Sequence, residues 1–160
     1  MIMSDTVSRT IECSTEADTL ALAALLAAAV PPGRLIALEG DLGAGKSTLA
    51  RAFIRARLGD GEAEVPSPTF TLVQTYDCDD GIEVWHADLY RLTDPEDAYE
   101  LGLDEARDDG ICLIEWPDRM PEDWWSGALT IRLTIGEQGE RTVALSGDER
   151  WQPILEGLAA

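Results

Sequence analysis

The stretch Gly40-Asp41-Leu42-Gly43-Ala44-Gly45-Lys46-Ser47-Thr48 decides the fold that this sequence predicts. It satisfies the pattern G-x-x-x-x-G-K-[ST] in full, with the apolar run 34–39 (RLIALE) before it and helical periodicity over 46–58 after it. Such a loop gathers backbone N–H groups, and its glycines let the backbone approach phosphate oxygens closely. The following helix directs its positive end to the same place. The stretch therefore predicts a strand, a phosphate-binding loop and a helix.

Two side chains of this loop carry the predicted chemistry. Lys46 is expected to reach the β- and γ-phosphates of ATP, and the Ser47 hydroxyl to bind Mg²⁺. Lys46 is also the single lysine beside eleven arginines, which indicates a role that arginine does not fill. A chance glycine loop between strand and helix is the disfavoured alternative. The residues expected to line the nucleotide are Asp41, Leu42, Gly43, Ala44, Gly45, Lys46, Ser47 and Thr48.

A phosphate loop needs a second magnesium anchor, normally a carboxylate at the end of a neighbouring strand. Glu115 follows the fully apolar run 111–114, and Asp88 follows the run 84–87 (VWHA). Both are expected at the carboxyl edge of the sheet, where ligands bind in open α/β proteins. One would hold magnesium, directly or through water, while the other orients the attacking water. The residues alone leave the division open, and a solvated strand end or helix cap is the alternative for each.

Three further polar features lie near this predicted site. His86 is the single histidine, and a packed, hydrogen-bonded role is favoured for it over catalysis. Arg91 is read equally well as a site residue and as a salt-bridge partner on an acidic surface. The segment 67–71 (SPTFT) is either a switch-like loop that senses the γ-phosphate through Thr69 or an ordinary proline-containing loop.

The rest of the chain predicts an α/β fold with a mainly parallel sheet covered on both faces. Helices are expected over 14–30, with Ser14 or Thr15 as N-cap, over 94–101, and as a short element at the end of the chain. The segments 70–76 and 82–85 read as strands joined by a turn at Asp80-Gly81. The segments 129–135 and 141–145 read as a second hairpin, so both hairpins add antiparallel edges. An EF-hand reading of Asp77 to Asp80 fails, because Ile82 stands where that loop needs glycine.

Composition restricts the possible functions. The 160 residues fit one domain, 1–160, and contain no apolar run long enough to span a membrane. The first residues lack the basic flank and cleavage site of a signal peptide, and three cysteines without a ligand pattern suit a reducing cytosol. We therefore expect a cytoplasmic protein. The net charge of −19 disfavours autonomous nucleic-acid binding, although it equally well serves solubility alone.

Four segments in this order and spacing resemble one known family. They are GDLGAGKST (40–48), SPTFTLVQTY (67–76), HADLYRL (86–92) and IEWPD (114–118). The chain resembles the bacterial tRNA threonylcarbamoyladenosine biosynthesis ATPases, the TsaE family, from about Glu12 to Leu145. The Walker loop alone is generic, whereas its combination with H-x-D-x-Y-R and E-W is specific. Ser47 stands where many members have threonine, and Phe70 replaces the commoner tyrosine.

The resemblance implies a compact P-loop ATPase with a three-layer sandwich fold that works within a complex. Its expected partners are the kinase-like transferase subunit and its paralogous scaffold, which modify adenosine 37 of tRNAs reading codons that begin with A. Contact with tRNA is expected only through that complex, and ATP hydrolysis is expected to reset it between turnovers.

The resemblance also implies roles for individual residues. Lys46 and Ser47 hold phosphate and magnesium, Glu115 holds magnesium, and Asp88 is the acid needed for hydrolysis. Thr69 belongs to the switch-like loop, and Trp116 follows the acid as the family pattern expects. The weaker matches Glu16 and Gly139 are expected to border the adenine.

Two other functions are compatible with the phosphate loop. A small-molecule P-loop kinase shares the loop, but it usually has a mobile arginine-bearing lid, and here the arginines after Glu115 are scattered. A nucleotide-dependent binding module would associate with its partner without appreciable turnover. Hydrolysis measured with and without a phosphoryl acceptor distinguishes these functions from an ATPase.

Overall fold

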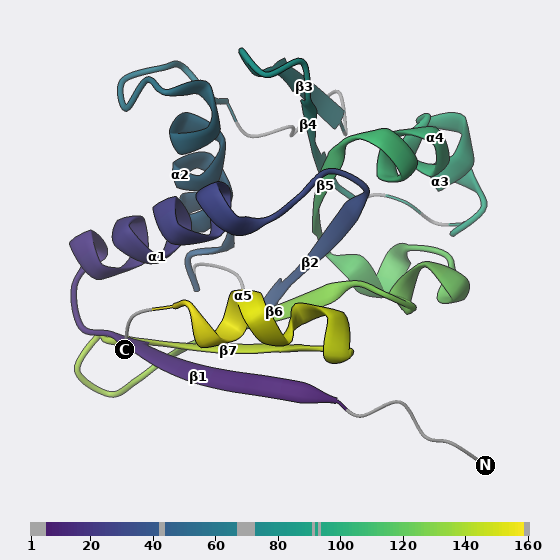
Figure 1. Cartoon of the computed structure of the whole chain (residues 1–160). Coiled ribbons are helices and arrows are strands. Elements are labelled where there is room, and N and C mark those ends of the chain that lie inside the picture. The colour runs from purple at the N-terminus through teal and green to yellow at the C-terminus, as the bar shows by residue number, and fades with distance from the viewer. Residues whose placement is uncertain (1–5, 42–43, 67–72, 91, 93, 159–160) are drawn as a thin grey trace.

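The computed structural model describes residues 6–41, 44–66, 73–90, 92 and 94–158. In that part of the chain, seven strands form one mixed sheet in the order β1-β7-β6-β2-β5-β4-β3, with helices on its two faces (Figure 1). The strands are β1 (Val7–Cys13), β2 (Arg34–Gly40), β3 (Val73–Asp77), β4 (Glu83–Asp88), β5 (Ile111–Glu115), β6 (Leu129–Ile135) and β7 (Arg141–Gly147).

The four central strands β6, β2, β5 and β4 are parallel, and the outer pairings are antiparallel. The two predicted hairpins, β3–β4 and β6–β7, are therefore confirmed, but only β3–β4 lies at an edge of the sheet, because β1 lies outside β7. The prediction of a mainly parallel sheet is wrong, because antiparallel strand pairings are as frequent as parallel ones. The difference comes from β1, which the sequence did not predict. β1 lies near the start of the chain and pairs with β7, which lies near its end.

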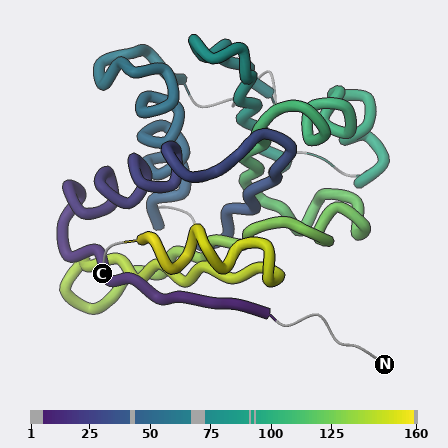
Figure 2. The backbone as a smooth tube through the Cα atoms, viewed as in Figure 1, coloured from purple at the N-terminus to yellow at the C-terminus, as the bar shows by residue number. Residues whose placement is uncertain are grey.

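Helices α1 (Glu16–Ala29), α2 (Lys46–Leu58) and the C-terminal α5 (Gln152–Glu156) pack on one face of the sheet. The bounds of α2 agree with the predicted helix. Thr15 caps α1 through a reciprocal pair, in which Thr15 Oγ1 accepts from the Asp18 N–H and Asp18 Oδ2 accepts from the Thr15 N–H. Figure 2 shows the C-terminal helix α5 lying across β7 and β1, and Arg9 of β1 donates to the Leu155 carbonyl of α5, so the first strand and the last helix meet on this face.

The opposite face carries α3 (Asp97–Glu100), α4 (Leu103–Asp109) and two 3₁₀ turns, Pro117–Arg119 and Glu122–Trp125. The helix predicted over 94–101 is thus wrong in its extent. Gly102 adopts φ of 82°, which is a left-handed conformation that separates the two short helices.

Alternating residues of the central strands feed two separate cores. Ile36 and Leu38 pack toward α1 and α2, whereas Leu35 and Ala37 pack toward α3 and α4. This alternation fixes which strand-end side chains face α2 and the loop before it. None of the helices in the described part of the chain has the length and apolar composition needed to cross a bilayer.

Candidate functional site

The loop after β2 is built around glycines that tolerate no side chain. Gly40 has φ of 147°, and a Cβ there would lie 2.6 Å from the carbonyl oxygen of Leu133 on β6. Gly45, with φ of 107°, is the N-cap of α2 and offers no side-chain cap. The first N–H groups of α2 are therefore available to an anion.

Lys46 begins α2 and is almost fully buried, with 5% of its surface exposed. Its Nζ donates to the carbonyl oxygen of Gly40 at 2.6 Å and lies 4.0 Å from the centre of the Trp116 ring. A backbone carbonyl and the face of an aromatic ring both attract an ammonium group, so these two contacts hold the Lys46 side chain in place. The single lysine is thus positioned at the mouth of the predicted loop.

Trp116 is held in a strained conformation beside Lys46. Its φ of 59° makes it the one non-glycine residue with positive φ among the described residues. Such a conformation costs about 1–3 kcal/mol and persists where surrounding contacts enforce it. Here the ring lies under Lys46 on one side and 4.9 Å from the Tyr90 ring on another.

Glu115 joins α2 to strand β4 through its two carboxylate oxygens. Ser47 Oγ donates to Oε1 at 3.0 Å, and His86 Nε2 lies 2.6 Å from Oε2. His86 is fully buried and Glu115 is 3% exposed. Burial pushes the pKa of Glu115 upward, but the hydrogen bond and charge of His86, with Ser47 and Lys46, hold it below its usual range. The carboxylate is therefore ionised, and the imidazole Nε2–H donates to it.

Asp88 lies opposite Glu115 in the parallel register of β4 and β5. The expectation that both acids reach the same edge of the sheet is confirmed. Burial raises the pKa of Asp88 above its usual range, although the Tyr90 backbone N–H donates to Oδ1 at 3.0 Å and opposes the rise. Glu115 raises that pKa further, and Lys46 lowers it. The two neighbouring acids thus differ in environment, which is typical of carboxylates with different tasks.

The donor set at this edge fits magnesium. Ser47 and Glu115 present a hydroxyl and a carboxylate oxygen to the same point, and Mg²⁺ prefers such oxygen ligands. Among the described residues, no group of three or more His, Cys, Asp or Glu side chains gathers as a protein-only metal site.

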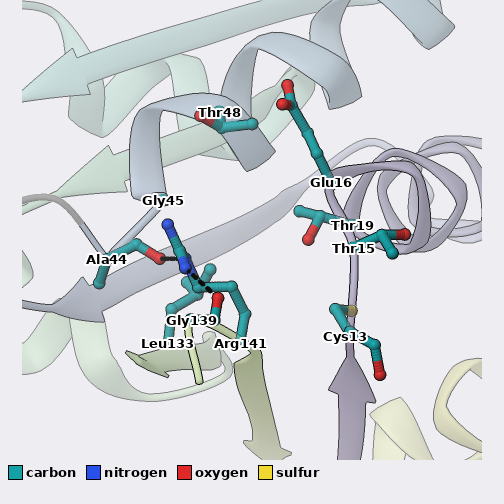
Figure 3. Close-up of a pocket in the computed structure, with 11 residues that line it drawn as sticks. Cys13, Thr15, Glu16, Thr19, Ala44, Gly45, Thr48, Leu133, Gly139 and Arg141 are labelled. Carbon is teal, nitrogen blue, oxygen red and sulfur yellow. Dashed lines mark hydrogen bonds between the residues drawn. The ribbon is translucent and has the colours of Figure 1, made fainter. Parts of the chain in front are cut away.

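A cavity of about 140 Å³ lies beside the loop, between α1, α2 and the β6–β7 turn (Figure 3). We call it the α1–α2 pocket. The residues lining it are Cys13, Ser14, Thr15, Glu16, Thr19, Ala44, Gly45, Thr48, Leu133, Gly139 and Arg141. Glu16 and Gly139 were the weakest sequence assignments, and the fold brings both to the wall that Ala44, Gly45 and Thr48 also form.

Arg141 is a site residue that the sequence reading missed. Its Nε donates to the Ala44 carbonyl at 2.9 Å and its Nη1 to the Gly139 carbonyl at 2.7 Å, as the dashed lines in Figure 3 show. The guanidinium group thereby connects the β6–β7 turn to the loop. Nothing in the local sequence marks Arg141, because Ala44 is 97 residues away along the chain.

The structure brings most of the predicted residues together. Lys46, Ser47, Glu115 and Asp88 surround one end of the loop, and His86, predicted to be packed and hydrogen-bonded, is so through Glu115 itself. The sequence of β4 could have indicated that His86 lies near the acids. His86 and Asp88 are two residues apart in the strand and therefore share one face of the sheet. Asp41 directly follows β2. The predicted positions Leu42, Gly43, Thr69, Phe70 and Arg91 lie outside the described residues.

Comparison with known proteins gives consistent matches over nearly the whole chain. The family model described as threonylcarbamoyl adenosine biosynthesis protein TsaE matches residues 13–143. A tRNA threonylcarbamoyladenosine biosynthesis protein TsaE of Rickettsia felis is 34% identical over 91% of this chain and 84% of its own length. One of Bacillus subtilis is 36% identical over 89% of this chain and 88% of its own. The crystal structure of Bacillus subtilis YdiB superposes with a TM-score of 0.72 at 30% identity, covering 99% of this chain and 97% of that one.

Proposed function

The chain belongs to the TsaE family of tRNA threonylcarbamoyladenosine biosynthesis proteins, and from that premise we propose that it is the ATPase subunit of the complex that modifies adenosine 37 of tRNA. The proposal includes a single P-loop domain that binds Mg²⁺ and ATP. Its partners are the transferase subunit and that subunit's paralogous scaffold, and tRNA contact passes through them.

The observation that carries this proposal is the arrangement of Lys46, Ser47 and Glu115 at the end of a loop with the full Walker pattern. Lys46 is close enough to the loop carbonyl of Gly40 to exchange that acceptor for a phosphate oxygen. Ser47 and Glu115 would hold Mg²⁺, which neutralises charge on the β- and γ-phosphates when bound. Glu16 and Gly139 would border the nucleoside in the α1–α2 pocket.

Hydrolysis requires a water molecule oriented toward the γ-phosphate, and Asp88 is the candidate for this task. Its raised pKa makes it a better proton acceptor than an ordinary surface carboxylate. Glu115 is a poorer proton acceptor, because His86, Ser47 and Lys46 hold its pKa below the usual range despite its burial. We therefore assign proton acceptance to Asp88 and magnesium binding to Glu115.

The test is ATP hydrolysis by the purified protein, alone and then with the transferase–scaffold pair and tRNA. We expect slow phosphate release alone, faster release with the pair, and continued formation of modified tRNA. Asp80→Asn, at the exposed β3–β4 turn, is the matched control and should behave like the parent. A rate of ATP hydrolysis that is the same with and without the transferase–scaffold pair would refute the tRNA assignment. Phosphate transfer to an added small molecule would indicate a kinase.

A further inference from the structure

A second polar pocket lies at the opposite end of the sheet from the phosphate loop. It has a volume of about 180 Å³ and is lined by Arg34, Arg107, Arg150 and Trp124, among others. Arg34 begins β2, whose other end carries the loop, so roughly 20 Å of strand separates the two sites. We call this second site the basic pocket. None of its residues takes part in the proposed hydrolysis.

Two of its arginines, Arg34 and Arg107, have no carboxylate within salt-bridge distance among the described residues, although the charge of Arg34 contributes to the lowered pKa of Asp148. The Arg34 guanidinium lies 5.4 Å from the centre of the Trp151 ring, and that of Arg107 lies 5.0 Å from the Trp124 ring. Within the described part of the chain, neither forms a salt bridge or donates a hydrogen bond. Acidic residues outnumber basic ones by 31 to 12, so unpaired arginines are not explained by a shortage of carboxylates.

Buried donors at the same place also lack acceptors. Arg34 Nε and Trp124 Nε1 are inaccessible to solvent and have no hydrogen-bond partner among the described residues. Trp124 itself is 1% exposed. Buried N–H groups are nearly always paired in native proteins, and an unpaired one points to an acceptor such as a bound ion. Stacking on tryptophan holds the guanidinium planes and leaves their N–H edges free to donate.

The local charges favour a small anion over a larger acidic partner. Arg150 is already engaged by Asp148 at 2.7 Å, and the exposed Asp108 also lines the pocket. Three guanidinium groups therefore face two carboxylates, a local excess of one positive charge. The net charge of −19 disfavours an extended nucleic-acid backbone, whereas a recess of this size accommodates one tetrahedral group. Guanidinium forks match phosphate oxygens in bidentate geometry.

We propose that the basic pocket binds a single phosphate group, either free inorganic phosphate or a small phosphate monoester, through Arg34 and Arg107. The site is independent of the nucleotide site and of the activity proposed for it. Phosphate in the pocket supplies acceptors to the guanidinium groups that line it and balances the excess positive charge.

The test is titration of the ¹⁵N-labelled protein with inorganic phosphate at constant ionic strength, following the side-chain N–H resonances of Arg34 and Trp124. We expect saturable shifts at both, retained in Lys46→Ala, which removes the charge of the phosphate loop. Arg34→Gln and Arg107→Gln should each weaken binding roughly tenfold, because each removes a charge-assisted contact. Equal shifts with glycerol 3-phosphate would assign the site to monoesters, and weaker ones to free phosphate.

Arg57→Gln is the control, because Arg57 lies on α2 and pairs with Asp80 away from the pocket. Thermal unfolding without phosphate identifies a variant that fails to fold. If Arg34→Gln does not fold, Arg107→Gln on the short helix α4 tests the same pocket. Absence of saturable shifts in the parent would overturn the proposal. Shifts that disappear in Lys46→Ala but persist in Arg107→Gln would overturn it too, since they would place phosphate at the loop alone.

Discussion

Replacing His86 with leucine tests whether its contact with Glu115 maintains an ionised acid inside the protein. Both side chains are nearly inaccessible to solvent, and Nε2 and Oε2 are 2.6 Å apart. Removing one partner of a buried pair costs about 3–5 kcal/mol, because the other charge is left uncompensated. Ser47 still donates to Oε1, so we expect a loss near 3 kcal/mol. For a chain of this length that lowers Tm by roughly 6–12 °C.

The same substitution should change the response to acid. The pKa of Glu115 in the folded protein lies below its ordinary value of 4.5, so its ionised form stabilises the fold above that pH. This stabilisation is lost as the pH falls from about 4.5 through the folded-state pKa. Without His86 the folded-state pKa of Glu115 rises toward its ordinary value, so the stability lost on acidification should become smaller or disappear.

Thermal unfolding followed by circular dichroism, and urea unfolding across the pH range 3–7, measure both effects. The double variant His86→Leu/Glu115→Leu should recover much of the lost stability, because replacing a whole buried pair with apolar groups is often nearly neutral. His86→Gln, which retains a donor, should lose less than His86→Leu. A loss below about 1 kcal/mol in His86→Leu, with an unchanged acid limb, would refute the assigned contact.

The remaining predictions concern the nucleotide site. Lys46→Ala should weaken ATP binding roughly 10- to 150-fold in calorimetry, because the phosphates lose a charged donor, and unchanged affinity would contradict the phosphate-loop assignment. Asp88→Ala should bind ATP but lose turnover, and parent-like phosphate release would exclude Asp88 from the mechanism. Asp88→Asn should raise the Tm of the nucleotide-free protein at pH 7. The folded-state pKa of Asp88 lies above 3.8, so stability falls as the pH rises from 3.8 through that pKa, and the neutral amide avoids this loss. A lower Tm in Asp88→Asn would contradict the predicted direction. Arg141→Ala should weaken nucleotide binding about tenfold by releasing Ala44, with Arg9→Ala as a control distant from the loop; equal affinities would show that the tether is dispensable.

Much of the fold was predictable because its determinants are local. The helix over 46–58 and the strand over 129–135 have the predicted bounds, since periodicity and glycine positions act within a few residues. The helix over 94–101 was wrong in extent because Gly102, at the boundary of two helices, was not recognised as a left-handed break. β1 was missed because its exposed face consists of Ser8, Thr10 and Glu12 and its other face includes Arg9, so the run resembles a polar loop.

The sequence by itself determined the phosphate loop, the acids at the strand ends and the family resemblance, since each depends on residue type and short spacing. The tertiary structure alone decided that His86 contacts Glu115, that Trp116 is strained beneath Lys46, and that Arg141 reaches Ala44. It also gathered Arg34 and Arg107 into one pocket. These contacts join segments far apart in the chain, and their geometry follows from sheet register and packing, which no local pattern encodes.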